Sequence, residues 1–417
     1  MFDKLFFFIY ILIMKQLIGL DEALALIKQN STFNDKIGRE SIDIDKSVGR
    51  VTAFDYYADT DFPPFNKSAM DGYVVVNPNL TEYKILGKIK AGDSSDITLN
   101  NDECLAIMTG APVNKNGIKI IINEDVEVIG DKIKVLKNSQ ATNIAYKGED
   151  LKSGEISLKK NSIITPFSVG TLANSGIKKV EVYKKVEIGV AITGDELIDI
   201  DKKPELGMIR DINSYTLLSK INSIPFCKVK YLGIVKDTLN ETQKIINKFL
   251  DSDASLLILS GGSSRGDFDF VVKALESLKI TILFEGVKVQ PGKPVIFAKH
   301  KDKLIFGLPG NPVSVLISFE VFIKEALYRL QNQDYDSVVF NGELTEDFKR
   351  RNQERTLFFP VSIINNGEKN FVTPVKYNGS GHINSYNYIK YLGIIKEGIT
   401  ELKKGENILV RQIWQNY

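Results

Sequence analysis

The alternation of apolar runs and amphipathic segments between residues 186 and 330 limits the fold of this chain most strongly. Short runs such as "VEIGVAITG" and "SLLILSGG" are almost continuously apolar, and longer segments such as "NETQKIINKFL" and "VSVLISFEVFIKEALYRL" lie between or after them. Buried strands that alternate with helices of this kind are typical of a mostly parallel sheet with helices on both faces. We therefore predict an α/β domain over 184–335, with ligands beyond the carboxyl ends of its strands.

With 417 residues, the chain is longer than one hydrophobic core usually organises, so we expect further domains. Leu20, Leu24 and Ile27 follow helical spacing, so an amphipathic helix is expected over 20–30. Short β-branched runs separated by Gly, Asn and Asp predict a β-rich module over 61–140. Segments 14–60 and 141–183 flank it as one N-terminal helical part, and short strands and turns after 336 predict a small C-terminal β-barrel over 336–417.

Composition excludes several classes of function. The net charge is +2, from 54 basic and 52 acidic residues, so no overall field favours nucleic acid or an anionic membrane. Only two cysteines, Cys104 and Cys227, are present, which predicts neither a disulfide framework nor a zinc cluster and favours the cytoplasm. Only two histidines, His300 and His382, are available for a metal site or a catalytic triad.

The segment "LFFFIYILI", Leu5–Ile13, is similar to the apolar part of a signal peptide. It is too short to span a bilayer, and no small-residue cleavage site follows it. We expect residues 1–13 to be an extension without a function of its own.

A glycine-rich loop follows the predicted strand at Leu256–Leu259. Gly261, Gly262 and Gly266 permit close backbone approach, Ser263 and Ser264 add hydroxyl donors, and a helix is expected to begin near Asp267. Such a loop suits an anion, although a plain strand-to-helix turn remains an alternative. Asp267 and Asp269 favour the first interpretation, because a carboxylate beside a phosphate site implies Mg²⁺ between them.

Two Pro-Gly turns, Gln290–Pro294 and Leu308–Val315, are predicted to form the lip of the same pocket. Lys293 would supply a point charge for phosphate, or would simply be a solvated lysine. In the second turn Asn311 suits an N-cap and Pro312 the first helical position, so that turn has a purely structural explanation as well.

Acidic residues follow several predicted strands, namely Asp150, Asp195, Glu196 and Asp237. Each alone is explained by a solvated turn or a helix cap, whereas several at one sheet edge would hold a divalent cation against a polyanion. In the β-rich module, "PPFNKSAMDGYVV" places Asp71 at the mouth of an apolar run, and Thr109 lies on an irregular turn where its hydroxyl can donate to an oxyanion.

Eight motifs together resemble the MoeA family of molybdopterin molybdenumtransferases, which includes the gephyrin E domain. In chain order they are "SAMDGYVV", "MTGAPV", "INEDVE", "GEDL", "ITGDEL", "SGGSSRGDFDF", "PGKP" and "LPGNPVSV". The resemblance implies a homodimer whose α/β domain is MogA-like. It also implies a reaction in which adenylylated molybdopterin and molybdate react with Mg²⁺ present, AMP is released, and molybdenum stays on the dithiolene.

The resemblance also assigns roles to residues. The implied catalytic residues are Asp71, Thr109, Glu196, Asp237 and Asp269, and the implied metal ligands are Asp71, Glu196 and Asp269. The implied substrate-binding residues are Asp150, Gly261, Gly262, Ser263, Ser264, Gly266, Lys293, Pro309 and Pro312. Asp71 would act from the inserted module on the partner subunit's active site.

The chain departs from the family pattern at three places. Gln290 stands where a lysine is common, and Arg265 lies within the glycine loop. Any one of Arg350, Arg351 and Arg355 could correspond to the arginine that the family has in its C-terminal domain. Two alternatives stay open: a MogA-type molybdopterin adenylyltransferase, which would lack the inserted module, and a non-catalytic scaffold, which would not need the carboxylates. The family also allows a contact with a molybdopterin adenylyltransferase that delivers the intermediate.

Overall fold

A computed structural model describes residues 17–34, 37–93, 96–261 and 267–414, with the side chains of 267–269 left undescribed. The chain divides into two compact units, which are described separately: a large unit of Met1–Arg39 with Tyr183–Tyr417, and a small unit of Glu40–Val182. The prediction for residues 1–13 lies outside the described residues. The finer domain boundaries proposed above stay predictions.

The large unit contains a six-stranded sheet in the order β16-β13-β17-β21-β20-β18. Its strands are β13 (Val186–Thr193), β16 (Cys227–Val235), β17 (Leu256–Ser260), β18 (Thr281–Glu285), β20 (Ile296–His300) and β21 (Lys303–Leu308). The first four strands in the sheet order are parallel, and β20 and β18 are antiparallel to their neighbours. This arrangement confirms the predicted α/β class.

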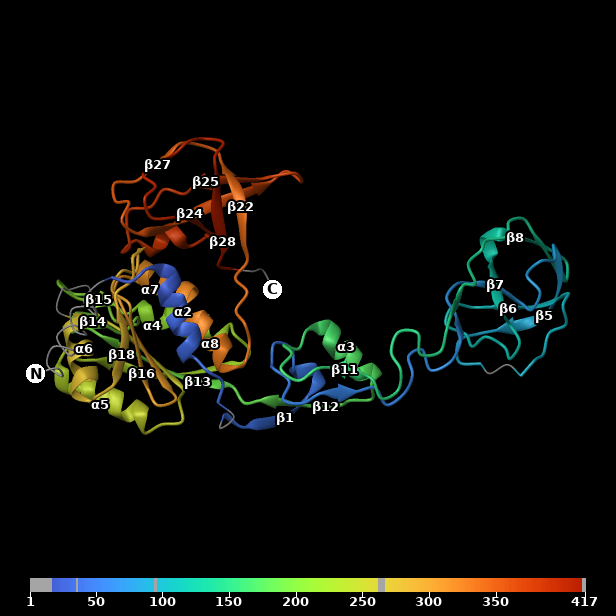
Figure 1. The fold of residues 1–417 in the computed structure, drawn as a ribbon, viewed down its shortest axis with the longest axis horizontal. Helices are drawn as coiled ribbons and strands as arrows, with labels where there is room; N and C mark the ends of the chain where they lie inside the picture. The colour runs from blue at the N-terminus through green and yellow to red at the C-terminus, as the bar shows by residue number, and fades with distance from the viewer. Residues whose placement is uncertain (1–16, 35–36, 94–95, 262–266, 415–417) are drawn as a thin grey trace, which may run out of the picture. The chain divides into compact units, whose positions relative to one another are not determined.

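Helices cover both faces of this sheet (Figure 1). On one side are α5 (Leu239–Leu250) and α6 (Asp267–Ser277), and on the other are α2 (Leu20–Asn30), α4 (Asn213–Asn222), α7 (Pro312–Ser318) and α8 (Lys324–Leu330). Helix α5 begins where the Thr238 side chain accepts from the Glu241 N–H, and it buries Ile245, Ile246 and Phe249 against the sheet. The helix predicted over 20–30 is confirmed as α2.

The long C-terminal helix of the α/β part is not regular throughout. Between α7 and α8, residues Phe319–Ile323 form a π-helical turn whose side chains are all buried. Glu320 in this turn is fully buried: its Oε1 lies 2.7 Å from Lys220 Nζ, and its Oε2 lies 2.7 Å from Lys324 Nζ as an ion pair. Its carbonyl accepts from Arg411 Nη2 at 2.9 Å. The turn therefore connects α4 and α8 to the end of the last strand.

The C-terminal part of the large unit is a closed barrel of β22 (Val339–Leu344), β24 (Thr356–Asn365), β25 (Asn370–Pro374), β26 (Tyr391–Ile395) and β28 (Asn407–Gln412). It closes because β24 pairs with both β25 and β26. A further short strand, β19 (Val289–Gln290), comes from the α/β part and pairs in parallel with the start of β24. The predicted C-terminal β-barrel is thus confirmed.

The small unit contains the predicted β-rich module as a six-stranded sheet in the order β7-β4-β6-β5-β9-β8. Its strands are β4 (Gly72–Val75), β5 (Glu82–Ile89), β6 (Glu103–Ile107), β7 (Lys119–Ile122), β8 (Val126–Ile129) and β9 (Lys132–Val135). Alternate residues enter two separate cores, Val74 and Leu105 in one and Val75 and Cys104 in the other. The central strands β4 and β6 are therefore buried on both faces.

The segments that flank the module form the rest of the small unit. They contain helix α3 (Pro166–Asn174) and three short strand pairs: β1 (Arg39–Asp43) with β12 (Lys179–Tyr183), β2 (Tyr56–Tyr57) with β11 (Ile156–Leu158), and β3 (Lys67–Ser68) with β10 (Ile144–Ala145). Across the described ranges of both units, every helix is too short or too polar to cross a lipid bilayer.

Candidate functional site

The carboxyl ends of the four parallel strands bring many of the predicted residues to one edge of the sheet. Glu196 follows β13, Asp237 follows β16, Gly261 follows β17 and Pro309 follows β21. These strands are adjacent in the sheet, so the residues, although far apart in sequence, lie along one edge. This is the edge at which open α/β sheets bind ligands.

Hydrogen bonds connect the loops at this edge. The Asp237 N–H donates to Asp195 Oδ1 at 3.4 Å, which joins the loops after β16 and β13. The Ser260 hydroxyl donates to the Pro309 carbonyl at 3.1 Å, and Asn213 Nδ2 donates to the Gly310 carbonyl at 2.7 Å. The loop after β21 is therefore held from two sides.

The glycine loop is only partly described. The Gly261 N–H donates to the Leu308 carbonyl at 3.3 Å, so this amide holds the loop and is not free for an anion. Gly262, Ser263, Ser264, Arg265 and Gly266 lie outside the described residues. Asp269 lies in α6, one of the helices that cover the sheet, and its side chain is not described.

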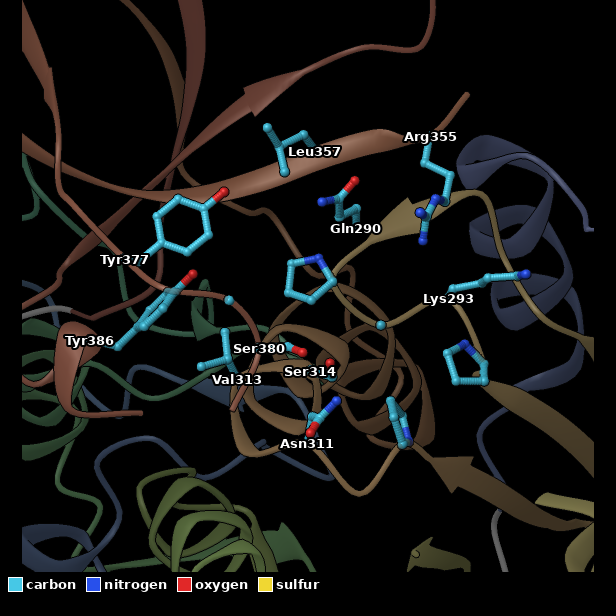
Figure 2. Close-up of a pocket in the computed structure, with 15 residues that line it drawn as sticks. Gln290, Lys293, Asn311, Val313, Ser314, Arg355, Leu357, Tyr377, Ser380 and Tyr386 are labelled. Carbon is cyan, nitrogen blue, oxygen red and sulfur yellow. The ribbon is translucent and has the colours of Figure 1, made fainter. Parts of the chain in front are cut away.

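A pocket of about 350 Å³ opens next to this edge, between the α/β part and the barrel (Figure 2). Four segments line it: the turn after β19, the loop after β21, the start of β24, and a barrel loop. The lining residues are Gln290, Pro291, Gly292, Lys293, Pro294, Pro309, Asn311, Val313, Ser314, Arg355, Leu357, Tyr377, Gly379, Ser380 and Tyr386. Both predicted Pro-Gly turns contribute to it.

Two cations and no carboxylate are among these lining residues. Neither Lys293 nor Arg355 has a hydrogen bond or an ion pair from its side chain to any part of the chain that the structure describes. Of the three candidate arginines, Arg355 alone lines this pocket. The Arg350 guanidinium donates to backbone carbonyls, including that of Arg355 at 2.6 Å, Arg351 is exposed outside the lining, and Arg355 faces the pocket.

Two neutral polar residues that the sequence analysis did not predict as ligands, Ser314 and Asn311, also line the pocket. Ser314 is 4% exposed, yet its hydroxyl makes no hydrogen bond within the described ranges. Asn311 occupies the N-cap position of α7 as predicted, but its side chain makes no capping hydrogen bond, and it lines the pocket. Pro312 begins the helix. Because these polar groups are unused, they are available to a ligand.

Strand pairing positions the two cations. Val289 pairs with Thr356 in the parallel β19–β24 ladder, which puts Arg355 beside Lys288. The turn after β19 folds back, since the Val287 N–H donates to the Lys293 carbonyl at 2.9 Å, and this brings Lys293 to the same place. Figure 2 shows the Arg355 side chain extending toward that turn. Gly292 in the turn has φ of +104°, and a Cβ there would lie 3.0 Å from Ser318 Oγ, so a glycine is required.

The opposite end of the pocket is aromatic. The rings of Tyr377 and Tyr386 are 6.3 Å apart and nearly perpendicular. Tyr386 is 6% exposed, its hydroxyl has no hydrogen-bond partner among the described residues, and burial raises its pKa, so it is protonated. In Figure 2 both tyrosines lie across the pocket from Arg355 and Lys293, with their hydroxyl ends toward the other lining residues.

In the small unit, Asp71 and Thr109 are brought together. Strands β4 and β6 are antiparallel, with Gly72 opposite Ile107, so the residue before β4 meets the turn after β6. Asp71 Oδ1 accepts from the Thr109 N–H at 2.6 Å and from the Thr109 hydroxyl at 2.8 Å. These two hydrogen bonds, the N–H first, hold the pKa of Asp71 below its ordinary value, and Lys88 adds to the effect. Asp71 is therefore an exposed, fixed carboxylate.

Asp150, the other predicted residue of the small unit, is exposed on a turn. Its N–H donates to the Phe62 carbonyl at 3.1 Å, which ties the turn to the segment that leads to Asp71. No three His, Cys, Asp or Glu side chains gather into a metal-binding group anywhere in the described ranges.

Comparison with known proteins places the chain in a family. Residues 18–176 match a family model described as MoeA N-terminal region (domain I and II), and residues 189–329 match a probable molybdopterin binding domain. The chain is 34% identical to the molybdopterin molybdenumtransferase of Haemophilus influenzae over 304 aligned residues. The alignment covers 70% of this chain and 73% of that protein. It is 32% identical over 383 residues to a putative molybdopterin biosynthesis protein of Methanocaldococcus jannaschii, covering 88% and 90% of the two chains. The chain belongs to the MoeA family.

A solved MoeA structure has the same fold. The molybdopterin biosynthesis MoeA protein of Pyrococcus horikoshii OT3 superposes with a TM-score of 0.80 at 26% identity, over 95% of this chain and 100% of that one. The predicted family is thus confirmed. The roles that the resemblance gave to single residues stay predictions.

Proposed function

We propose that this MoeA chain is a molybdopterin molybdenumtransferase of molybdenum cofactor biosynthesis. It would insert molybdate into adenylylated molybdopterin and release AMP. The observation that carries the proposal is the pocket at the ligand-binding edge of the sheet, where two cations, Lys293 and Arg355, have no protein partner within the described residues. The names of the curated relatives support the same activity.

The cationic end of the pocket suits molybdate. Molybdate is a dianion without a proton at neutral pH, so it needs hosts that donate hydrogen bonds or carry positive charge. Lys293 and Arg355 supply two positive charges, and Ser314 and Asn311 supply neutral donors. Arg355 offers a planar, fixed fork and Lys293 a point charge, so Arg355 orients the anion and Lys293 mainly attracts it.

The strand ends beside the pocket suit the diphosphate of the adenylylated substrate. Mg²⁺ is usually bound by one or two carboxylates together with substrate phosphates and water, and a cage of protein ligands is not required. Glu196 and Asp237, on adjacent loops that the Asp195 hydrogen bond joins, provide such carboxylates. Bound there with Asp269 as a further ligand, Mg²⁺ would neutralise charge on the departing phosphate. Glu196 and Asp237 would keep the hydrated ion at the strand ends.

Asp71 is proposed to act as an ionised carboxylate throughout the neutral range. The Thr109 hydrogen bonds fix its orientation, which is what a group that positions a metal or a water needs. We infer a homodimer in which Asp71 serves the partner subunit's site and is one of the metal ligands there. A contact with the adenylyltransferase that makes the intermediate belongs to the same proposal.

The test is AMP release and cofactor formation from adenylylated molybdopterin with molybdate and Mg²⁺. Wild type should do both, and Asp71→Ala and Arg355→Ala should lose cofactor formation while they remain folded. Arg351→Ala is the matched control, because Arg351 lies in the same segment outside the pocket lining. Nucleotide binding without any AMP release by the wild type would refute the proposal.

The two alternatives predict different results. A molybdopterin adenylyltransferase would consume ATP and produce the adenylylated intermediate, and a scaffold would do neither. The match of residues 18–176 to the MoeA N-terminal region favours the transferase, because this segment carries Asp71 and Thr109 and a stand-alone adenylyltransferase lacks it.

A further inference from the structure

The two ends of the pocket differ in chemistry. Lys293, Arg355 and Gln290 form a polar, cationic end, whereas Tyr377, Tyr386 and Leu357 form an aromatic and apolar one. Figure 2 shows the tyrosines and the cations on opposite sides of the pocket. A site built only for a small inorganic anion has no use for the aromatic end.

The size of the pocket leads to the same conclusion. At about 350 Å³ it lies in the range of pockets that hold organic ligands. A tetrahedral oxyanion with five heavy atoms is much smaller than the organic ligands that such pockets hold. The remaining space adjoins the tyrosines.

Tyr386 provides an independent observation. Its hydroxyl is buried without a hydrogen-bond partner within the described ranges, although the ring lines the pocket. An unpaired buried hydroxyl is unfavourable, and a ligand atom that accepts from it relieves the cost. A planar heterocycle with ring nitrogens and a carbonyl offers such an acceptor and a face for Tyr377.

We propose that the tyrosine end of this pocket binds the pterin ring system of the substrate, while the cationic end holds molybdate. Tyr377 packs against the ring, and Tyr386 donates a hydrogen bond to it, so both act as positioning residues. The proposal rests on the proposed function, because it assigns the organic part of that substrate. Adenine, the other heterocycle of the substrate, shares this chemistry and is the competing ligand.

The test uses three probes with the full chain. Binding of pterin-6-carboxylate is measured from its fluorescence, and binding of AMP and of molybdate is measured by calorimetry. Tyr377→Ala should weaken pterin binding by about 5- to 150-fold, which corresponds to the free energy of base–aromatic stacking, and should leave molybdate binding within twofold. Tyr388→Ala is the matched control, since Tyr388 is 90% exposed nearby in the same loop and does not line the pocket.

Tyr386→Phe separates recognition from folding. It removes only the unpaired hydroxyl, so the thermal midpoint of the free protein should stay the same or rise, while pterin binding weakens by about 3- to 10-fold. A role confined to packing would not combine these two changes.

The outcomes distinguish this inference from the proposed function. If wild type binds molybdate and releases AMP but both tyrosine variants bind pterin normally, the pterin assignment alone is wrong. If Tyr377→Ala weakens AMP binding and leaves pterin binding intact, the assignment is also wrong, because adenine occupies that end. If wild type neither binds molybdate nor releases AMP, the proposed function fails irrespective of the tyrosines.

Discussion

Replacing Glu320 with glutamine should destabilise the large unit strongly. Glu320 is fully buried, and its carboxylate neutralises Lys220 and Lys324, whose side chains are 14% and 17% exposed. Glutamine keeps the shape but leaves two largely buried ammonium groups without a counter-charge. Loss of one partner from a buried ion pair costs about 3–5 kcal/mol. At about 2 °C per kcal/mol for a unit of this size, the thermal midpoint should fall by roughly 6–10 °C.

The assay is thermal and urea unfolding of the full chain, with Glu325→Gln as the matched control. Glu325 is also buried in the same helix and pairs with Arg329, but Arg329 keeps a second partner, Asp334, at 2.6 Å. The control should therefore lose no more than about 1 kcal/mol. The double variant Glu320→Gln/Lys324→Gln should recover part of the loss, since it removes one uncompensated charge. Equal losses in the two single variants would refute the reasoning.

Three further predictions concern the small unit. Thr109→Val should raise the pKa of Asp71 toward its ordinary 3.8, as measured from the carboxyl carbon by NMR. Because the folded-state pKa is lowered, the hydrogen bond stabilises the module above pH 3.8, and this stabilisation is lost as the pH falls through the lowered pKa. An unchanged pKa in the variant would contradict the role of the Thr109 hydroxyl. Gly72→Ala places a Cβ 2.2 Å from the Ile121 carbonyl oxygen and should cost at least about 2 kcal/mol in urea unfolding; no change would contradict the close approach. Burial raises the pKa of Cys104 to about 12, so a thiol reagent should modify it at pH 8 only after denaturant is added, and rapid reaction of the native chain would argue against its burial.

Local pattern was enough to predict the architecture. The apolar runs over 186–330 correspond to the parallel strands, because strands buried on both faces require such runs. The helix over 20–30 was predicted from the spacing of its apolar residues. The π-helical turn at Phe319–Ile323 was not, since its residues read as continuous helix and only the buried Glu320 marks it.

The pocket shows where sequence reasoning stops. Arg350, Arg351 and Arg355 are equivalent as a pattern, and only the folded chain shows that Arg355 is the one of the three that lines the pocket. Asn311 was interpreted as a helix cap because its position is correct, but its side chain makes no capping hydrogen bond. Tyr377 and Tyr386 carried no local signal, because their role depends on the loop that folds back against the α/β part.

The pairing of β19 with β24 also determines how this protein can be divided. The Thr356 N–H donates to the Lys288 carbonyl at 2.9 Å, so on one side the first residues of β24 pair with the α/β part, while on the other side Leu357 pairs with Ile395 of β26. A fragment that begins after residue 336 would carry an otherwise closed barrel with an unpaired stretch of strand at one rim. Exposed strand edges recruit other strands, so such a fragment should self-associate in solution. A synthetic peptide that includes Val289 and Gln290, added in excess, should suppress that association by taking the place of the missing strand.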